Sequence, residues 1–194
     1  MARGTEKAQV SGDELQVEVD ATTEQQYVTV CGIRVRLARP YKLNFEWVGN
    51  RTVLNQLRAS WHCTHPGESS MNPRLVGKPG VGKTALAYAA AVNMELPVFF
   101  FQGTADTLPN DLLINPLVVE TSKDHSHVEY IASTVITAMI VGGVCILDEG
   151  NRMQEKAWAS LAPLLDSRRY VESVAVGLLL KAHPNFRFVA TMND

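Results

Sequence analysis

Hydrophobic residues are spaced differently at the start of the chain and in the rest of it. Up to residue 37, apolar and polar residues alternate in short segments, which is the pattern of β-strands with one buried face. These segments cover residues 15–19, 27–30 and 33–37. Residues 1–12 are polar and charged, so we expect a disordered start there. The pattern predicts that residues 1–44 form this start and a small N-terminal β appendage.

From residue 45 onward, continuous apolar runs alternate with stretches of helical spacing. The helical stretches cover residues 53–61, 84–93, 134–141 and 153–165, and the apolar runs cover residues 74–76, 98–102, 144–147 and 186–191. A hairpin-like stretch, residues 170–180, precedes the last run. Strands that alternate with helices are typical of a parallel sheet with helices on both faces. We therefore predict an α/β fold, a three-layer domain with a parallel sheet over residues 45–194.

Composition and charge exclude several classes of protein. The 18 Lys and Arg residues against 20 Asp and Glu give a net charge of −2, so no general attraction draws the chain to nucleic acid or an anionic membrane. The N-terminus lacks the apolar core of a signal peptide, and the longest apolar run, residues 138–147, is too short to span a bilayer. Cys31, Cys63 and Cys145 are far apart and odd in number, which argues against a disulfide framework. We expect a soluble cytoplasmic protein with no membrane partner.

The glycine-rich turn after residue 76 is a full match to the phosphate-binding P-loop. It reads Gly77-Lys78-Pro79-Gly80-Val81-Gly82-Lys83-Thr84, with an apolar strand before it and an Ala-rich helix after it. Glycines let the backbone wrap closely around phosphate oxygens, and the first N–H groups of the helix, including that of Ala85, add donors. Lys83 is expected to reach the β- and γ-phosphates, and Thr84 to place its hydroxyl on Mg²⁺. The sequence thus predicts a site for a nucleoside triphosphate and Mg²⁺.

A second motif supplies the acidic groups that hydrolysis needs. The apolar strand over residues 144–147 ends in Asp148 and Glu149. Asp148 is expected to hold Mg²⁺ and Glu149 to polarise the attacking water, because the metal neutralises charge while a separate carboxylate orients the nucleophile. The strand between the two motifs and the adjacent Glu favour ATPases with an additional strand over small GTPases.

Three stretches together resemble the MoxR-type branch of the AAA+ ATPases. They are Gly80-Val81-Gly82-Lys83-Thr84, Leu147-Asp148-Glu149-Gly150-Asn151-Arg152 and Ala190-Thr191-Met192-Asn193. The family usually has Ile at the position of Gly150, a difference of little chemical weight. The resemblance extends over residues 45–194 and implies Mg²⁺-dependent ATP hydrolysis. It also implies a chaperone-like role in the remodelling of protein complexes.

The resemblance implies positions for further parts of the site. AAA+ enzymes carry a polar sensor residue where Asn193 stands, on a strand between the strands of the two motifs, so Asn193 joins Glu149 and Lys83 as a candidate catalytic residue. Val48 and Gly49 are expected to lie against the adenine. Inserted hairpins are expected within residues 117–130 and 170–181.

Family members form hexameric rings and often act with partners that carry von Willebrand A domains. The resemblance therefore implies a homo-oligomeric ring and a protein client or such a partner. The sequence ends at Asp194, ahead of the arginine finger, the fifth strand and the helical lid of the family. An arginine supplied in trans is worth ~10³-fold or more in rate. We expect the chain by itself to bind nucleotide and to hydrolyse it slowly.

Two other functions stay open at this point. A nucleic-acid-acting or restriction-type NTPase from a neighbouring AAA+ branch shares the Thr-Met-Asn region and can prefer GTP, although the acidic balance disfavours nucleic acid as a partner. A non-hydrolysing, nucleotide-gated module is the second, and the intact Lys83, Asp148 and Glu149 disfavour it. Arg152 is a candidate interface residue. Arg168 and Arg169 are candidates for contact with the nucleotide of a neighbouring subunit, although cations near a helix end also suit its dipole.

Overall fold

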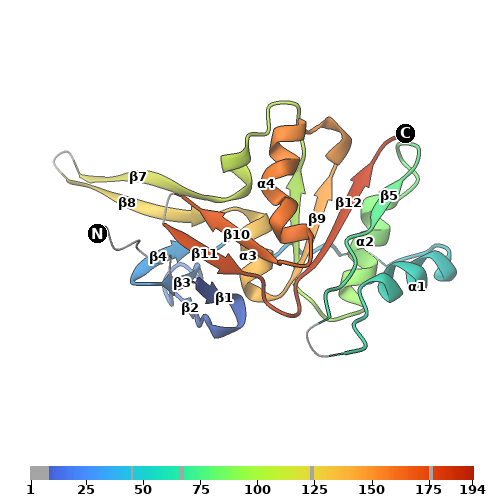
Figure 1. Ribbon diagram of the computed structural model, residues 1–194, viewed down its shortest axis with the longest axis horizontal. Helices are drawn as coiled ribbons and strands as arrows, with labels where there is room; N and C mark the ends of the chain where they lie inside the picture. Colours follow the sequence, from blue (N-terminus) through green and yellow to red (C-terminus); the bar gives the residue numbers. More distant parts are fainter. Residues whose placement is uncertain (1–8, 45, 66–67, 123–124, 175–176) are drawn as a thin grey trace, which may run out of the picture.

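The computed structural model describes residues 9–44, 46–65, 68–122, 125–174 and 177–194. Its centre is a four-stranded parallel sheet in the order β5-β12-β9-β6 (Figure 1). The strands are β5 (Arg74–Val76), β6 (Val98–Gln102), β9 (Val144–Asp148) and β12 (Arg187–Met192). Strand β12 lies between β5 and β9, as expected for the strand that leads to Asn193. The carboxyl ends of β5, β12 and β9 therefore meet at one edge of the sheet.

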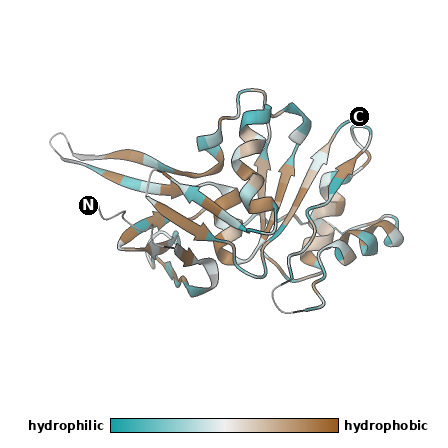
Figure 2. Cartoon of the chain, in the orientation of Figure 1, coloured by the Kyte–Doolittle hydropathy of each residue, from teal (hydrophilic) through white to brown (hydrophobic). Residues whose placement is uncertain are grey.

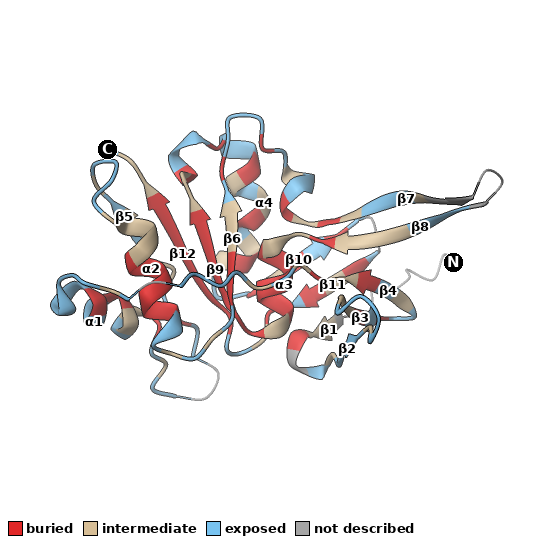
Figure 3. Ribbon diagram, turned by 180° about the vertical axis from the view of Figure 1, so that it is seen from behind, coloured by how far each residue is buried: buried red, intermediate tan, exposed pale blue. Residues whose placement is uncertain are grey.

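Alternate side chains of the central sheet pack against different helices. The helices are α1 (Arg51–Ser60), α2 (Lys83–Val92), α3 (Thr134–Val141) and α4 (Glu155–Leu165). In β9, Ile146 belongs to the buried cluster of α1 and α2, whereas its neighbour Leu147 belongs to the cluster of α3 and α4. The central strands are largely hydrophobic (Figure 2), and β9 and β12 are largely buried (Figure 3). The prediction of a three-layer α/β sheet is confirmed.

The helix starts follow from local chemistry. Asn50 Oδ1 accepts the N–H of Thr52 at 2.8 Å at the start of α1, and Ser133 Oγ accepts the N–H of Ile136 at 3.1 Å at the start of α3. Helix α2 follows Gly82 and has no such side-chain cap. Its first N–H groups are therefore left for a ligand. No helix in the described part of the chain is both long and apolar enough to cross a membrane.

Two hairpins interrupt the alternation of strands and helices, as predicted. The first consists of β7 (Ile114–Ser122) and β8 (His125–Ala132) and projects from the body of the domain (Figure 1). The second consists of β10 (Tyr170–Ser173) and β11 (Leu178–Lys181). The N-terminal strands are β1 (Gln9–Ser11), β2 (Val17–Val19), β3 (Gln26–Val30) and β4 (Ile33–Arg36). They extend both hairpins, because β1 pairs with β11 and β4 pairs with β8.

The N-terminal region differs from the expectation in two respects. The predicted disorder is wrong for residues 9–11, which form β1 in parallel register with β11; residues 1–8 lie outside the described part. Val28 and Val35 are buried in the same core cluster as α3 and α4, and the N–H of Ala38 donates to Thr137 Oγ1 of α3 at 2.9 Å. These strands thus pack on the core of the parallel-sheet domain. A domain boundary after residue 44 stays a prediction.

Candidate active site

The loop between β5 and α2 turns sharply at two glycines. Gly80 and Gly82 have φ angles of 79° and 87°. Glycine adopts this left-handed region without steric cost, so the chain can turn back and enter α2 directly at Lys83. The N-terminus of α2 then presents backbone N–H groups and the positive end of its dipole to the loop. This arrangement suits the binding of phosphate.

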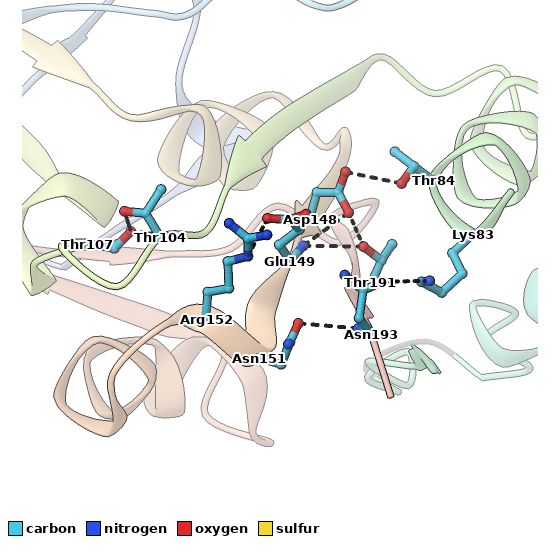
Figure 4. A network of polar contacts seen from close by, with 10 residues as sticks. All are labelled: Lys83, Thr84, Thr104, Thr107, Asp148, Glu149, Asn151, Arg152, Thr191 and Asn193. Carbon is cyan, nitrogen blue, oxygen red and sulfur yellow. Dashed lines mark hydrogen bonds and ion pairs between the residues drawn. The ribbon is translucent and has the colours of Figure 1, made fainter. Parts of the chain in front are cut away.

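Lys83 joins the P-loop to the end of β12. Its Nζ donates to the carbonyl oxygens of Gly77 at 2.7 Å and Lys78 at 2.9 Å. It also donates to Oδ1 of Asn193 at 3.0 Å (Figure 4). An ammonium group has three donors, and here each has an acceptor. The two carbonyl groups belong to the P-loop, which would surround bound phosphates. Phosphate oxygens can therefore replace these carbonyls as acceptors for Lys83. Two of the predicted catalytic residues, Lys83 and Asn193, are thereby in contact.

The two predicted metal ligands also meet. Thr84 Oγ1 lies 3.1 Å from Oδ2 of Asp148, at the end of β9. Mg²⁺ prefers hard oxygen donors and is commonly held by one or two carboxylates together with substrate phosphates, so this pair fits Mg²⁺. Within the described residues, no three His, Cys, Asp or Glu side chains form a metal-binding group. A metal at this place would therefore depend on phosphate oxygens as further ligands.

A buried hydroxyl orients Asp148 from behind. Thr191 is only 1% exposed, and its Oγ1 donates a short hydrogen bond to Oδ1 of Asp148 (Figure 4). The N–H of Glu149 donates to the same Oδ1 at 3.0 Å and to Thr191 Oγ1 at 3.4 Å. Such outer contacts fix the rotamer of a metal ligand. Thr191 stands two residues before Asn193, in the stretch that resembles the AAA+ ATPases, but the sequence alone predicted no role for its hydroxyl.

Glu149 sits in a constrained turn beside Asp148. Its φ angle is 53°, an unusual value for a residue with a side chain and one found at functional sites. Its Oε2 accepts from Nε of Arg152 at 2.7 Å, and Figure 4 shows the carboxylate directed towards Arg152, with Thr84 and Lys83 on the other side of Asp148. An ionised carboxylate only accepts hydrogen bonds, so Glu149 can orient a water molecule. A contact of Arg152 with another subunit stays a prediction.

Two adjoining cavities extend over the P-loop. The first has a volume of about 370 Å³ and is lined by Pro79, Gly80, Gly82, Lys83, Thr84, Ala85, Asp148, Glu149 and Asn193. The second has a volume of about 620 Å³ and is lined by Trp47, Val48, Gly49, Asn50, Val53, Arg74, Leu75, Val76, Gly80, Val81, Gly82, Lys83 and Leu86. The cavities share three P-loop residues. The residues predicted for phosphate and for adenine thus line one continuous region.

Not every predicted residue lines a cavity. Gly77 and Lys78 line neither of the two, and their carbonyl oxygens instead hold Lys83. Trp47 lines the larger cavity although no pattern in the sequence singled it out. A large aromatic residue directly before the Val48-Gly49 pair was the signal that could have identified it.

Arg168, Arg169 and Cys145 lie in different surroundings, and a contact of Arg168 with a neighbouring subunit stays a prediction. Arg168 pairs with Asp166 at 2.6 Å, and the hydrogen bonds from Arg168 lower the pKa of that carboxyl. Arg169 is buried and donates to the carbonyl oxygen of Phe186 at 2.8 Å, so it is a core residue rather than a subunit contact. Burial lowers the pKa of its guanidinium group. Cys145 is fully buried, as small apolar residues are, and burial raises the pKa of its thiol.

Comparison with known families identifies the region around this site. Residues 74–194 match the sequence model of the family described as AAA domain (dynein-related subfamily). The matched region includes the P-loop, both acidic residues and Asn193. It excludes Trp47, Val48 and Gly49. The family match therefore does not bear on the end of the larger cavity where adenine is expected, and only the geometry describes that end.

The chain is also similar to curated proteins and to a solved structure. An uncharacterized protein of Staphylococcus epidermidis is 31% identical over 124 residues, which cover 63% of this chain and 47% of that protein. An uncharacterized protein of Staphylococcus aureus is 26% identical over 143 residues, which cover 74% of this chain and 52% of that protein. The chain thus spans about half the length of the curated relatives it matches. A crystal structure of a Cytophaga hutchinsonii protein, provisionally described as an ATPase, shares the fold with a TM-score of 0.51 and 22% identity over 74% of this chain and 38% of that one.

Proposed function

This chain belongs to the AAA domain family (dynein-related subfamily), and we propose that it binds ATP with Mg²⁺ and hydrolyses the terminal phosphate bond. One observation carries the proposal. Lys83, Thr84, Asp148, Glu149 and Asn193 come from three separate segments of the chain and line one cavity of about 370 Å³. A P-loop that served only to shape a turn would not need these partners.

Each residue has a distinct part in this proposal. The N–H groups of the P-loop and the ammonium of Lys83 bind the phosphates. Thr84 and Asp148 would hold Mg²⁺, which when bound supplies positive charge against the phosphate oxygens. Glu149 orients the attacking water and accepts its proton, and Asn193 keeps Lys83 directed at the terminal phosphate.

The larger cavity supports ATP over GTP. Guanine presents N–H donors on its pairing edge, which a carboxylate binds best, and no Asp or Glu is among the described residues that line this cavity. The side-chain oxygen of Asn50 is already engaged by the N–H of Thr52. Adenine presents one amino donor and one ring acceptor, which a single peptide unit satisfies. The backbone groups of Val48 and Gly49 suit that task, since no hydrogen bond within the described residues engages them.

Calorimetry with MgATP tests the proposal. The unmodified chain is expected to bind, and Lys83→Ala should weaken binding by about 10- to 100-fold, because a charge-assisted hydrogen bond is worth about 1.5–3 kcal/mol. Lys156→Ala, an exposed lysine on α4, is the matched control and should bind as the unmodified chain does. Equal affinity of Lys83→Ala and the unmodified chain would contradict the assignment of the P-loop.

The biological role that we propose is the remodelling of a protein client by a homo-oligomeric ring, as in the MoxR-type ATPases that the motifs resemble. The projecting hairpin of β7 and β8 supports a protein client, since Val118 and Val128 pair across its strands and are 65% and 53% exposed. Sedimentation velocity of Glu149→Gln with MgATP tests the ring. Assembly that depends on ATP is expected, and a monomer at every concentration would contradict it.

A further inference from the structure

We propose that Trp47 is the base-contact residue of the nucleotide site, and that its six-membered ring forms the surface on which the adenine rests. This role depends on the nucleotide-binding function proposed above and adds to it the group that distinguishes a nucleotide from a bare polyphosphate. Trp47 lies outside the region matched to the AAA family, which begins at residue 74.

The ring of Trp47 lies between two segments that line the larger cavity, at Gly49 and at Gly82. A Cβ atom placed on Gly49 would lie 2.7 Å from Cε2 and 2.9 Å from Cη2 of Trp47, so the ring lies directly against the Val48-Gly49 backbone. A Cβ atom placed on Gly82 would lie 3.9 Å from Cζ3, at the opposite side of the same ring. One six-membered ring thus lies against the segment expected at the adenine and faces the last glycine of the P-loop.

Trp47 is also the least anchored of the three tryptophans. The indole N–H of Trp61 donates to the carbonyl oxygen of Phe188 at 3.0 Å, and that of Trp158 donates to Gly150 at 2.9 Å. The indole N–H of Trp47 is buried and has no partner among the described residues. Packing alone therefore holds this ring, against the cluster of α1 and α2.

Trp47 also lines a second, smaller cavity. It has a volume of about 230 Å³ and is lined by Trp47 together with Leu43, Glu46, Tyr88, Ala89, Val92 and Asn93. The indole therefore borders two cavities and has no polar anchor within the described residues, which allows it to adjust when a base enters. Aromatic rings bind bases through stacking, which tolerates any base, so the peptide of Val48 and Gly49 selects the purine and Trp47 supplies affinity.

The test compares two ligands that share the phosphates and differ in the base, MgATP and magnesium tripolyphosphate. Affinities are measured by calorimetry for the unmodified chain, Trp47→Ala and Trp47→Phe. Trp47→Ala should weaken ATP binding by about tenfold or more and tripolyphosphate binding by less than about twofold. Trp47→Phe keeps an aromatic face and should retain most of the affinity for ATP.

Tryptophan fluorescence of the folded chain gives an independent readout. ATP should change the emission and tripolyphosphate should not, and the change should disappear in Trp47→Phe but persist in Trp158→Phe. If Trp47→Ala loses affinity for both ligands equally, Trp47 only supports the P-loop. If it loses affinity for neither, Trp47 does not contact the base. Both results overturn the inference and leave the proposed function intact. If the unmodified chain binds neither ligand, the proposed function itself is wrong.

Discussion

Replacement of Thr191 by valine should weaken Mg²⁺ binding without creating a cavity. Valine has nearly the shape of threonine, so the buried position keeps its packing and loses only the hydroxyl. That hydroxyl donates to Oδ1 of Asp148 and accepts from the N–H of Glu149. A hydrogen bond to a charged group contributes about 1.5–3 kcal/mol, and loss of an outer contact of a metal ligand typically costs about 10- to 100-fold in metal affinity or activity. We therefore expect ATP turnover of Thr191→Val to need at least about tenfold more Mg²⁺.

The assay is a Mg²⁺ titration of ATP binding and hydrolysis, combined with urea unfolding of each variant. Thr137→Val is the matched control, because Thr137 is equally buried and its hydroxyl accepts the N–H of Ala38 far from the site. Both variants should lose stability, and the control should keep the Mg²⁺ dependence of the unmodified chain. If Thr191→Val loses stability but keeps that dependence, the hydroxyl does not orient Asp148 for a metal.

Two further predictions concern titratable groups. Burial raises the pKa of the Cys145 thiol, so the folded protein keeps a proton that the unfolded chain loses above about pH 8.5. Stability should be independent of Cys145 below that pH and fall above it by up to about 1.4 kcal/mol per pH unit; urea unfolding between pH 7 and 10 should show this slope, and Cys145→Ala should lack it. Hydrogen bonds from Arg168 lower the pKa of Asp166. NMR titration of Arg168→Ala should show that pKa rising towards its ordinary value, and an unchanged pKa would mean that the pair does not form in solution.

The sequence predicted well those parts of the fold whose signal is local. The apolar run over residues 98–102 is strand β6 with the same bounds, and the helical spacing over residues 134–141 is helix α3. The P-loop and the Asp148-Glu149 pair are each a run of consecutive residues. Each directly follows an apolar run, so the sequence places both at strand ends. The convergence of these motifs followed from one further expectation, that the strand before Asn193 lies in the middle of the sheet.

The features that escaped prediction depend on contacts between distant residues. Strand β1 is three residues long and pairs with β11, and a segment that short does not specify its partner. Thr191 acts through Asp148, a neighbour far away in the sequence, so no local pattern marks it. Trp47 stands directly before Val48-Gly49, but its position facing Gly82 follows only from the fold. Arg169 was a candidate for a contact with a neighbouring subunit or for a cation at a helix end; the structure buries it against the carbonyl oxygen of Phe186.

The central claim is that this site hydrolyses ATP and that Glu149 orients the water. The most direct test is the release of phosphate from MgATP by the unmodified chain and by Glu149→Gln, with ATP affinity measured on the same samples. The amide keeps the size of the side chain but cannot accept a proton, so Glu149→Gln should bind ATP with unchanged affinity and release almost no phosphate. Equal rates of phosphate release from the two proteins would contradict the account.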